Sequence, residues 1–294
     1  MRNFFLPIIF VLFSVSAFAD PTDSSSSTRR RVFRGDASSS DIKASNNQFG
    51  FQSISTNVNY TETGNGLLGS ATGTLDTETG PVSGRAYYFS EMVDVLFGND
   101  YFKASYDQSS GFTNYVGATL GPPAGAYGSV VSTSGAILTN YSFRYGKGFA
   151  NQSLSMITPY IEFGSHKWER GVNFGETYSN TYYGYGLLGQ YLLTNKLVLS
   201  LDAMYGHTTQ SAITVTSGPG LAGFSGALGN SDMYKIGASL DWAVAQRLHV
   251  TVGADYTAFN YGISATFPSG ASVAWEPDSK TNYTTVRLGL GWGF

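Results

Sequence analysis

The sequence predicts an all-β protein: a transmembrane, antiparallel up-and-down β-barrel of about ten strands, with eight or twelve strands as alternatives. Three observations support this fold class. From about residue 48 the chain repeats a two-faced strand, a short polar turn, a second such strand and a long loop rich in Gly, Ser and Thr. Charged residues make up only 13% of the chain, about half of the usual share, so much of the surface must face something other than water. No window keeps apolar residues at helical spacing over several turns.

The first 19 residues predict a secretory signal peptide. Arg2 supplies the positive start, residues 4–16 are almost wholly apolar, and "AFA" at 17–19 is a small-x-small cleavage site. The apolar run is shorter than the roughly 20 residues that a spanning helix needs, and no later stretch approaches that length. The mature chain is therefore expected either to be soluble outside the cytoplasm or to cross a membrane as a closed barrel.

Residues 20–46 are rich in Ser, Asp and Arg and contain almost nothing to bury. This composition predicts a disordered polar tail in the periplasm. The basic run at 29–31 could contact anionic lipid or peptidoglycan, but a solvated tail is the favoured interpretation. The barrel is predicted to occupy residues 47–294.

Short and long connections alternate along the barrel segment. Short turns are predicted at 97–100, 146–153, 193–196 and 245–247, and long loops near 63–82, 117–134, 169–180, 208–230 and 262–280. This alternation is typical of transmembrane barrels, with short periplasmic turns and long extracellular loops. The last two loops are long enough to hold hairpins that rise above the membrane.

The predicted strands have one apolar face and one face of small and polar residues. In "KLVLSLDAMYG", Leu199 and Leu201 lie on one side, and Ser200 and Asp202 lie on the other. The apolar faces often end in Tyr, Trp or Phe, as at a membrane interface. In a soluble sandwich the second face would be strongly charged, whereas here it carries Gly, Ser, Thr and isolated charges. The apolar faces are therefore expected to contact lipid.

The segment 83–96 is the weakest strand of the series. Glu91 and Asp94 lie on opposite faces of a regular strand. A β-bulge or a misplaced strand boundary is expected there.

The chain ends in "VRLGLGWGF", in which every second residue is large and apolar: Val286, Leu288, Leu290, Trp292 and Phe294. With the signal peptide and the alternating strands, this ending resembles the small outer-membrane β-barrels of Gram-negative bacteria, including opacity-like surface antigens. The resemblance implies that these five residues form the signal read by the barrel-assembly machinery. It also implies that the barrel lies among outer-membrane lipid and lipopolysaccharide, and that its loops contact host or matrix molecules.

The polar faces place charges of both signs in the expected lumen. The candidates are Lys103, Asp107, Arg144, Glu162, His166, Asp202, Lys235, Asp241, His249, Asp255 and Arg287. Unpaired buried charges are costly, so these groups are expected to pair. About ten strands is close to the size at which side chains fill a barrel. A structural network that plugs the lumen is favoured, with a gated path for protons or small ions as the alternative.

Composition excludes several classes of site. A net charge of −3 argues against a nucleic-acid partner. Without Cys there is no disulfide, thiolate catalysis or Cys-ligated zinc. The segment "TLDTETG" at 74–80 offers two carboxylates, too few for a calcium site, and is interpreted as a loop. No metal or cofactor is expected.

The expected function is structural or adhesive, carried by the extracellular loops of a non-enzymatic surface antigen. A narrow porin-like channel is the second hypothesis, and a hydrolase at the outer rim is the third. Omptin-type surface proteases also have ten strands, but their Asp-x-Asp and Asp-x-His pairs are missing here. The His-x-Ser of lipid A deacylase-type barrels is missing too. The histidines nearest to an acidic residue, His166 and His207, are therefore not assigned a catalytic role.

Overall fold

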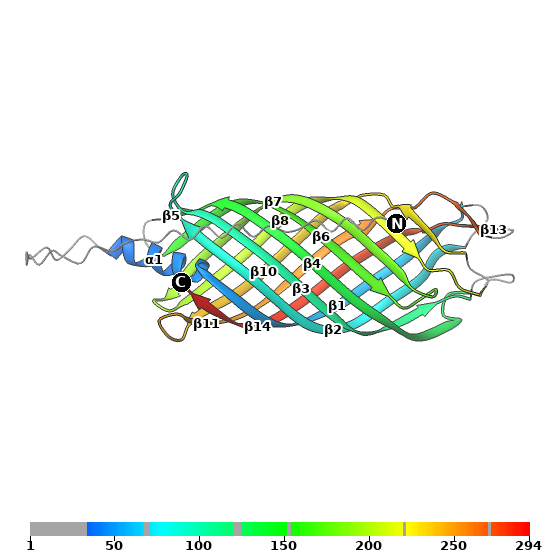
Figure 1. The fold of residues 1–294 in the computed structure, drawn as a ribbon, viewed down its shortest axis with the longest axis horizontal. Coiled ribbons are helices and arrows are strands. Elements are labelled where there is room, and N and C mark those ends of the chain that lie inside the picture. The colour runs from blue at the N-terminus through cyan, green and yellow to red at the C-terminus, as the bar shows by residue number, and fades with distance from the viewer. Residues whose placement is uncertain (1–33, 68–70, 120–124, 152–153, 220–221, 270–271) are drawn as a thin grey trace, which may run out of the picture. The chain divides into compact units, whose positions relative to one another are not determined.

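The computed structural model describes residues 34–294 except 68–70, 120–124, 152–153, 220–221 and 270–271 (Figure 1). The predicted signal peptide and residues 20–33 lie outside the described residues. Ten long strands form the wall of a barrel: β1 (Gln48–Asn65), β2 (Thr72–Val93), β3 (Asp100–Gly117), β4 (Val130–Lys147), β6 (Ser155–Arg170), β7 (Glu176–Thr194), β8 (Leu197–Val215), β10 (Asp232–Ala243), β11 (Leu248–Tyr261) and β14 (Asp278–Gly293).

The barrel is closed, and every neighbouring pair in its wall is antiparallel. Each long strand pairs with the next one along the chain, and β14 pairs with β1 over Gln48–Thr63. Figure 1 shows the strands strongly tilted, with α1 and the C-terminus at one end and β13 at the other. We call these the short-turn end and the long-loop end. The predicted fold class of a ten-stranded up-and-down barrel is confirmed.

Four short strands lie outside the barrel wall. β5 (Phe149–Asn151) pairs with β6, and β9 (Phe224–Ala227) pairs antiparallel with the end of β8. β12 (Phe267–Ser269) and β13 (Ser272–Ala274) form a separate hairpin. The predicted loop 262–280 therefore holds a hairpin of its own, whereas the strand in 208–230 pairs with the end of β8.

The apolar faces point outward and form a belt at the short-turn end. The five terminal apolar residues from Val286 to Phe294 are 47–60% exposed. Two arcs of tyrosines border the belt on the side of the long loops, and we call them the tyrosine girdle: Tyr87, Tyr106 and Tyr141 on β2–β4, and Tyr185, Tyr205 and Tyr234 on β7, β8 and β10. Neighbouring rings lie 5.0–6.3 Å apart. This is the outer surface of a barrel that sits in lipid.

The strands continue well beyond the tyrosine girdle, so the predicted long loops are too long. β1 ends at Asn65 and β2 begins at Thr72, which turns most of the predicted loop 63–82 into strand. On β14 the outward residues past Val286 are Thr284, Asn282 and Lys280. Beyond the lipid an outward side chain meets water, so the apolar alternation stops while the backbone ladder continues.

The irregularity expected in 83–96 is a strand boundary, since no register shift occurs there. β2 keeps its registers with β1 and β3 through this segment and ends at Val93. Asp94 lies in the turn, where it accepts a hydrogen bond from the Asn99 N–H at 2.6 Å. The two carboxylates differ in face because only Glu91 belongs to the strand.

The prediction of a disordered tail is wrong for its last part, because residues 34–46 form helix α1 (Arg34–Asn46). Ile42 is buried, and Lys43 Nζ lies 3.0 Å from a carboxylate oxygen of Asp94. The segment is polar overall, but Ile42 is buried at the mouth of the barrel and the side-chain amide of Asn46 bonds to the barrel wall. Within the described part of the chain, no helix has the length and apolar character needed to cross a bilayer.

Candidate functional site

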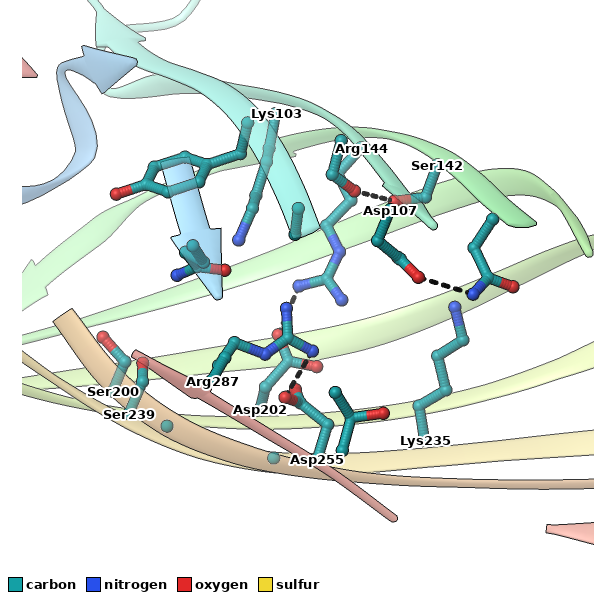
Figure 2. A pocket seen from close by; sticks show the side chains of 18 of the residues that line it. Lys103, Asp107, Ser142, Arg144, Ser200, Asp202, Lys235, Ser239, Asp255 and Arg287 are labelled. Atoms are coloured by element: carbon teal, nitrogen blue, oxygen red, sulfur yellow. Dashed lines mark hydrogen bonds and ion pairs between the residues drawn. The ribbon is translucent and has the colours of Figure 1, made fainter. Parts of the chain in front are cut away.

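The side chains predicted to face the lumen all lie inside the barrel. Ten of the eleven line one cavity of about 230 Å³, and the eleventh, His249, bonds through Nδ1 to Asp241 Oδ1 at 2.6 Å. Figure 2 shows Arg144, Asp202, Asp255 and Arg287 converging from opposite walls. The cavity lies at the level of the apolar belt, so these charges are enclosed by protein where the outer surface contacts lipid.

Arg144 is the centre of the network. Its guanidinium donates to Glu162 on the adjacent strand β6 and to Asp202 on β8. The Tyr160 hydroxyl donates to Asp202 Oδ1 at 2.7 Å, and the ring centroid lies 4.4 Å from the Arg144 guanidinium carbon. Lys235 on β10 completes the group, with its Nζ atom 2.7 Å from Glu162 Oε1. Every carboxylate in this group has a cation partner, which offsets the cost of burial.

Two further groups complete the lumen at this level. Arg287 pairs with Asp255, as expected for charges of opposite sign in the lumen. A chain of hydrogen bonds runs from Asp107 through Asn140 to His166, with distances of 2.7 and 2.6 Å. The His166 Nε2 atom lies 3.1 Å from the Tyr283 hydroxyl. Lys103 lies with Nζ 5.5 Å from the Tyr88 ring centroid.

Interior glycines make room for the tyrosines of the network. A Cβ atom on Gly186 would lie 2.4 Å from the Tyr160 ring, and one on Gly164 would lie 2.2 Å from the Tyr182 hydroxyl oxygen. Any larger residue at either position would displace a ring that holds a buried charge. The glycines expected on a crowded inner wall therefore have a specific use here.

Helix α1 closes the short-turn end of the lumen. Asn46 and Gln190 exchange side-chain hydrogen bonds of 2.8 and 3.2 Å, and Gln48 Nε2 on β1 donates to the Ser45 carbonyl of the helix at 2.6 Å. Ile42 is 1% exposed. The helix is therefore fixed to the inner wall by amide pairs and one buried apolar side chain.

A layer of aromatic rings fills the barrel beyond the charged cavity. Tyr60, Trp168, Tyr178 and Tyr261 are essentially inaccessible to solvent, at 0–1% exposure. Their ring centroids lie 5.1–5.9 Å from their neighbours in the layer. Such edge and offset contacts are favourable beyond the area that they bury. This layer separates the charged cavity from the long-loop end.

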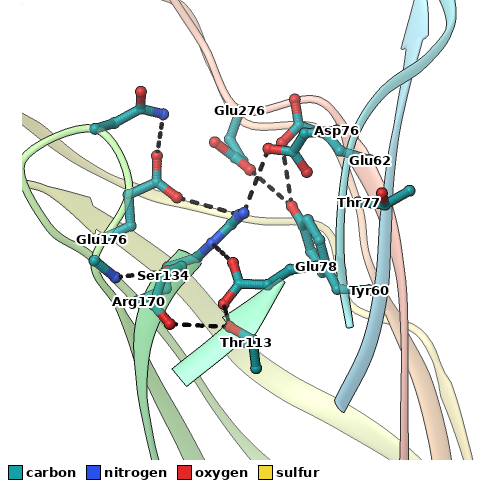
Figure 3. A network of polar contacts seen from close by, with 12 residues as sticks. Tyr60, Glu62, Asp76, Thr77, Glu78, Thr113, Ser134, Arg170, Glu176 and Glu276 are labelled. Carbon is teal, nitrogen blue, oxygen red and sulfur yellow. Dashed lines mark hydrogen bonds and ion pairs between the residues drawn. The ribbon is translucent and has the colours of Figure 1, made fainter. Parts of the chain in front are cut away.

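An acidic cluster, which the sequence did not reveal, lies beyond the aromatic layer (Figure 3). Arg170 is fully buried and contacts three carboxylates, at 2.8 Å to Glu78 Oε2, 3.4 Å to Asp76 Oδ2 and 3.3 Å to Glu176 Oε2. Two more carboxylates, Glu62 and Glu276, lie beside the Tyr60 hydroxyl. We call these five carboxylates and Arg170 the acidic cluster. Among the described residues Arg170 is the cation that faces them.

Strand parity could have located two of these carboxylates. Asp76 and Glu78 were interpreted as part of a loop, but β2 already begins at Thr72. They share the inward face with Val82 and Ala86, which are buried too. Because the outward residues of this part of β2 are polar too, it lacks the alternation of apolar and polar residues by which the other strands were recognised.

The acidic cluster makes the stability of the long-loop end depend on pH. Glu276 lies in the connection between β13 and β14, outside the lipid-facing part of the barrel, and burial raises the pKa of its carboxyl to about 8. The unfolded chain loses this proton near the ordinary pKa, so the folded state binds more protons between about pH 4.5 and 8. The free energy of unfolding should therefore fall as pH rises through this window, by at most about 1.4 kcal/mol per pH unit for one group.

Glu276→Gln should flatten this dependence, because the amide keeps the neutral form at every pH. Denaturant titrations of the refolded protein in lipid vesicles between pH 5 and 9 would measure it. Glu169→Gln, at an exposed carboxylate paired with Lys167, is the matched control and should follow the wild type. Identical pH profiles for the wild type and Glu276→Gln would contradict the raised pKa.

Comparisons with known proteins give the fold. No protein-family model and no curated protein matches the chain. The outer membrane protease OmpT from Escherichia coli superposes with a TM-score of 0.54 at 10% sequence identity, over 85% of this chain and 97% of that chain. The chain has the fold of the Gram-negative outer-membrane β-barrels. The translocator domain of the autotransporter NalP from Neisseria meningitidis also matches, with a TM-score of 0.42 at 12% identity, over 89% and 94% of the two chains.

The histidines of this outer-membrane barrel do not form an open catalytic site in the described structure. His166 is 3% exposed and lies between Phe259 and Tyr283. His249 is 4% exposed, next to Asp241. His207 lies on the outer wall with Nδ1 3.3 Å from Asp232 Oδ1, outside the lumen. A general base must reach a substrate, and two of the three are enclosed by side chains.

Proposed function

We propose that the protein is a closed outer-membrane barrel whose long-loop half projects from the cell and acts as a structural or adhesive surface antigen. The observation that carries the proposal is the series of barriers along the lumen. Helix α1 lies at one end, the charged network follows, and the aromatic layer and the acidic cluster lie beyond it. A narrow channel would need a continuous path through all of them.

The projecting half supports a surface role. The ten wall strands are 12–22 residues long, whereas about 9–11 residues cross a bilayer. The surplus lies beyond the tyrosine girdle, where outward residues such as Asn57 on β1 and Asn282 on β14 are polar. The wall and the β12–β13 hairpin thus form a rigid platform on which loops can contact other molecules.

Planar-bilayer recording of the refolded protein tests the closed lumen. We expect no stable open conductance, because each barrier is filled by side chains. Deleting residues 34–46 should leave the barrel closed, since the aromatic layer remains. Trp168→Ala together with Tyr178→Ala in the deleted chain removes two of the four barriers and should also stay closed, because the charged network and the acidic cluster remain. A stable conductance step of the wild-type protein would contradict the proposal and favour the channel.

Display on a non-adherent bacterium tests the adhesive role. We expect cells that carry the protein to attach to matrix-coated surfaces more than cells that carry a variant lacking residues 263–276, which include the β12–β13 hairpin. Heat-modifiable mobility on gels confirms that both barrels are folded. If both strains attach equally, at or below the level of the empty strain, the adhesive role is contradicted and the structural role remains.

A further inference from the structure

The lipid-facing surface becomes polar on β1 and β2 directly beyond their aromatic rings. The tyrosine girdle is continuous from Tyr87 on β2 to Tyr141 on β4. On β1 the outward residue in register with Tyr87 is Phe51, and the next two outward residues are Ser53 and Ser55. They face the apolar Leu288 and Val286 of β14. Small hydroxyl residues on β1 thus follow the aromatic rings, which leaves a shallow polar gap beside the apolar side chains of β14.

Arg85 lies in this gap and points outward. It pairs in register with Ser53 on β1 and with Gln108 on β3, and it lies one outward position beyond Tyr87. Paired residues of an antiparallel ladder have Cβ atoms about 5 Å apart. The Arg85 side chain therefore starts between a hydroxyl residue on one side and an amide residue on the other, and Gln108 also donates to the Thr139 hydroxyl at 3.3 Å.

Arg85 is exposed and has no ion-pair partner among the residues that the structure describes. By contrast, Lys167 on the outer wall pairs with Glu169, and His207 pairs with Asp232. An arginine on the lipid face costs about 2–4 kcal/mol at the middle of the bilayer and little at the interface. Its place at the edge of the belt is the level of lipid headgroups, where a phosphate can supply the missing counter-ion.

We propose that Arg85, with Ser53 and Gln108, binds a phosphate of a phosphorylated glycolipid in the outer leaflet of the membrane. A guanidinium binds phosphate through two parallel hydrogen bonds, and the neighbouring hydroxyl and amide add single donors. Below the site, Phe51 and Tyr87 form an apolar surface with ring centroids 5.5 Å apart, next to Leu290. Acyl chains can lie there while the phosphate contacts Arg85. The choice of leaflet rests on the proposed function, which places the long loops outside the cell.

Native mass spectrometry of the refolded protein in detergent tests this site. The probes are bisphosphorylated lipid A, the same lipid A without phosphates, and phosphatidylglycerol. We expect lipid A to bind and Arg85→Gln to bind it at least about tenfold more weakly, the loss of one charge-assisted pair. Arg85→Lys should keep part of the affinity. Lys280→Gln is the matched control, because it removes an exposed cation farther out on the same face, and it should bind as the wild type does.

Three outcomes would overturn the site. If phosphate-free lipid A binds equally well, the site does not recognise phosphate. If phosphatidylglycerol binds equally well, the site does not select a glycolipid. An equal loss of lipid A affinity in Lys280→Gln would show that the effect comes from net charge and not from Arg85 itself. Heat-modifiable mobility on gels shows that each variant is folded. Binding in detergent depends neither on conductance nor on cell attachment, so failure of this site and failure of the proposed function can be told apart.

Discussion

Arg170→Met should lower the free energy of unfolding by about 3–5 kcal/mol at pH 8, the usual cost of removing one partner from buried ion pairs. The substitution keeps much of the side-chain length but leaves five carboxylates without their cation. It also removes the guanidinium that lies 4.6 Å from the Tyr60 ring centroid and 5.0 Å from that of Trp168. The loss should shrink at pH 5, where the carboxylates can bind protons instead.

Denaturant titrations in lipid vesicles at both pH values would measure this effect. Lys167→Met is the control, because it breaks a pair whose side chains are 46% and 39% exposed and should cost less than about 1 kcal/mol. Arg170→Met combined with Glu78→Gln should regain part of the stability at pH 8. A loss that is the same at pH 5 and pH 8 would mean that packing, and not charge, is what Arg170 supplies.

Deletion of Phe294 should reduce assembly into the outer membrane several-fold while leaving export across the inner membrane intact. The terminal ring is 56% exposed on the outer wall, and it stacks on Phe89 with centroids 5.5 Å apart. The Phe294 N–H donates to the Asn47 carbonyl at 3.3 Å, next to the seam where β14 meets β1. The residue thus lies at the position where the last strand closes the barrel.

Fractionation of cells, with heat-modifiable mobility as the measure of folded barrel, would test this prediction. Phe89→Ala is the control, because it removes the stacked partner but keeps the terminal aromatic residue. If the terminal residue acts as an assembly signal, Phe89→Ala should assemble normally. Normal insertion of the deleted chain, or an equal defect in Phe89→Ala, would contradict that role.

The success of the face assignment has a simple physical origin. Side chains alternate strictly along a strand, so the direction of Arg144 or Asp202 follows from the apolar residues on either side of it. The same logic failed for Asp76 and Glu78, because their strand lies beyond the lipid, where the outward residues are polar. It also failed for residues 34–46, which form a helix through contacts with the barrel mouth.

By itself the sequence determined the fold class, the outward apolar belt and the set of charges inside the barrel, since each of these is a local consequence of strand parity. Only the tertiary structure decided which charges meet. Arg144 and Asp202 are 58 residues apart and lie on strands that are not neighbours, so their contact exists only after closure brings opposite walls together. The acidic cluster around Arg170, which gathers carboxylates from β1, β2, β7 and the last connection, depends on the same closure.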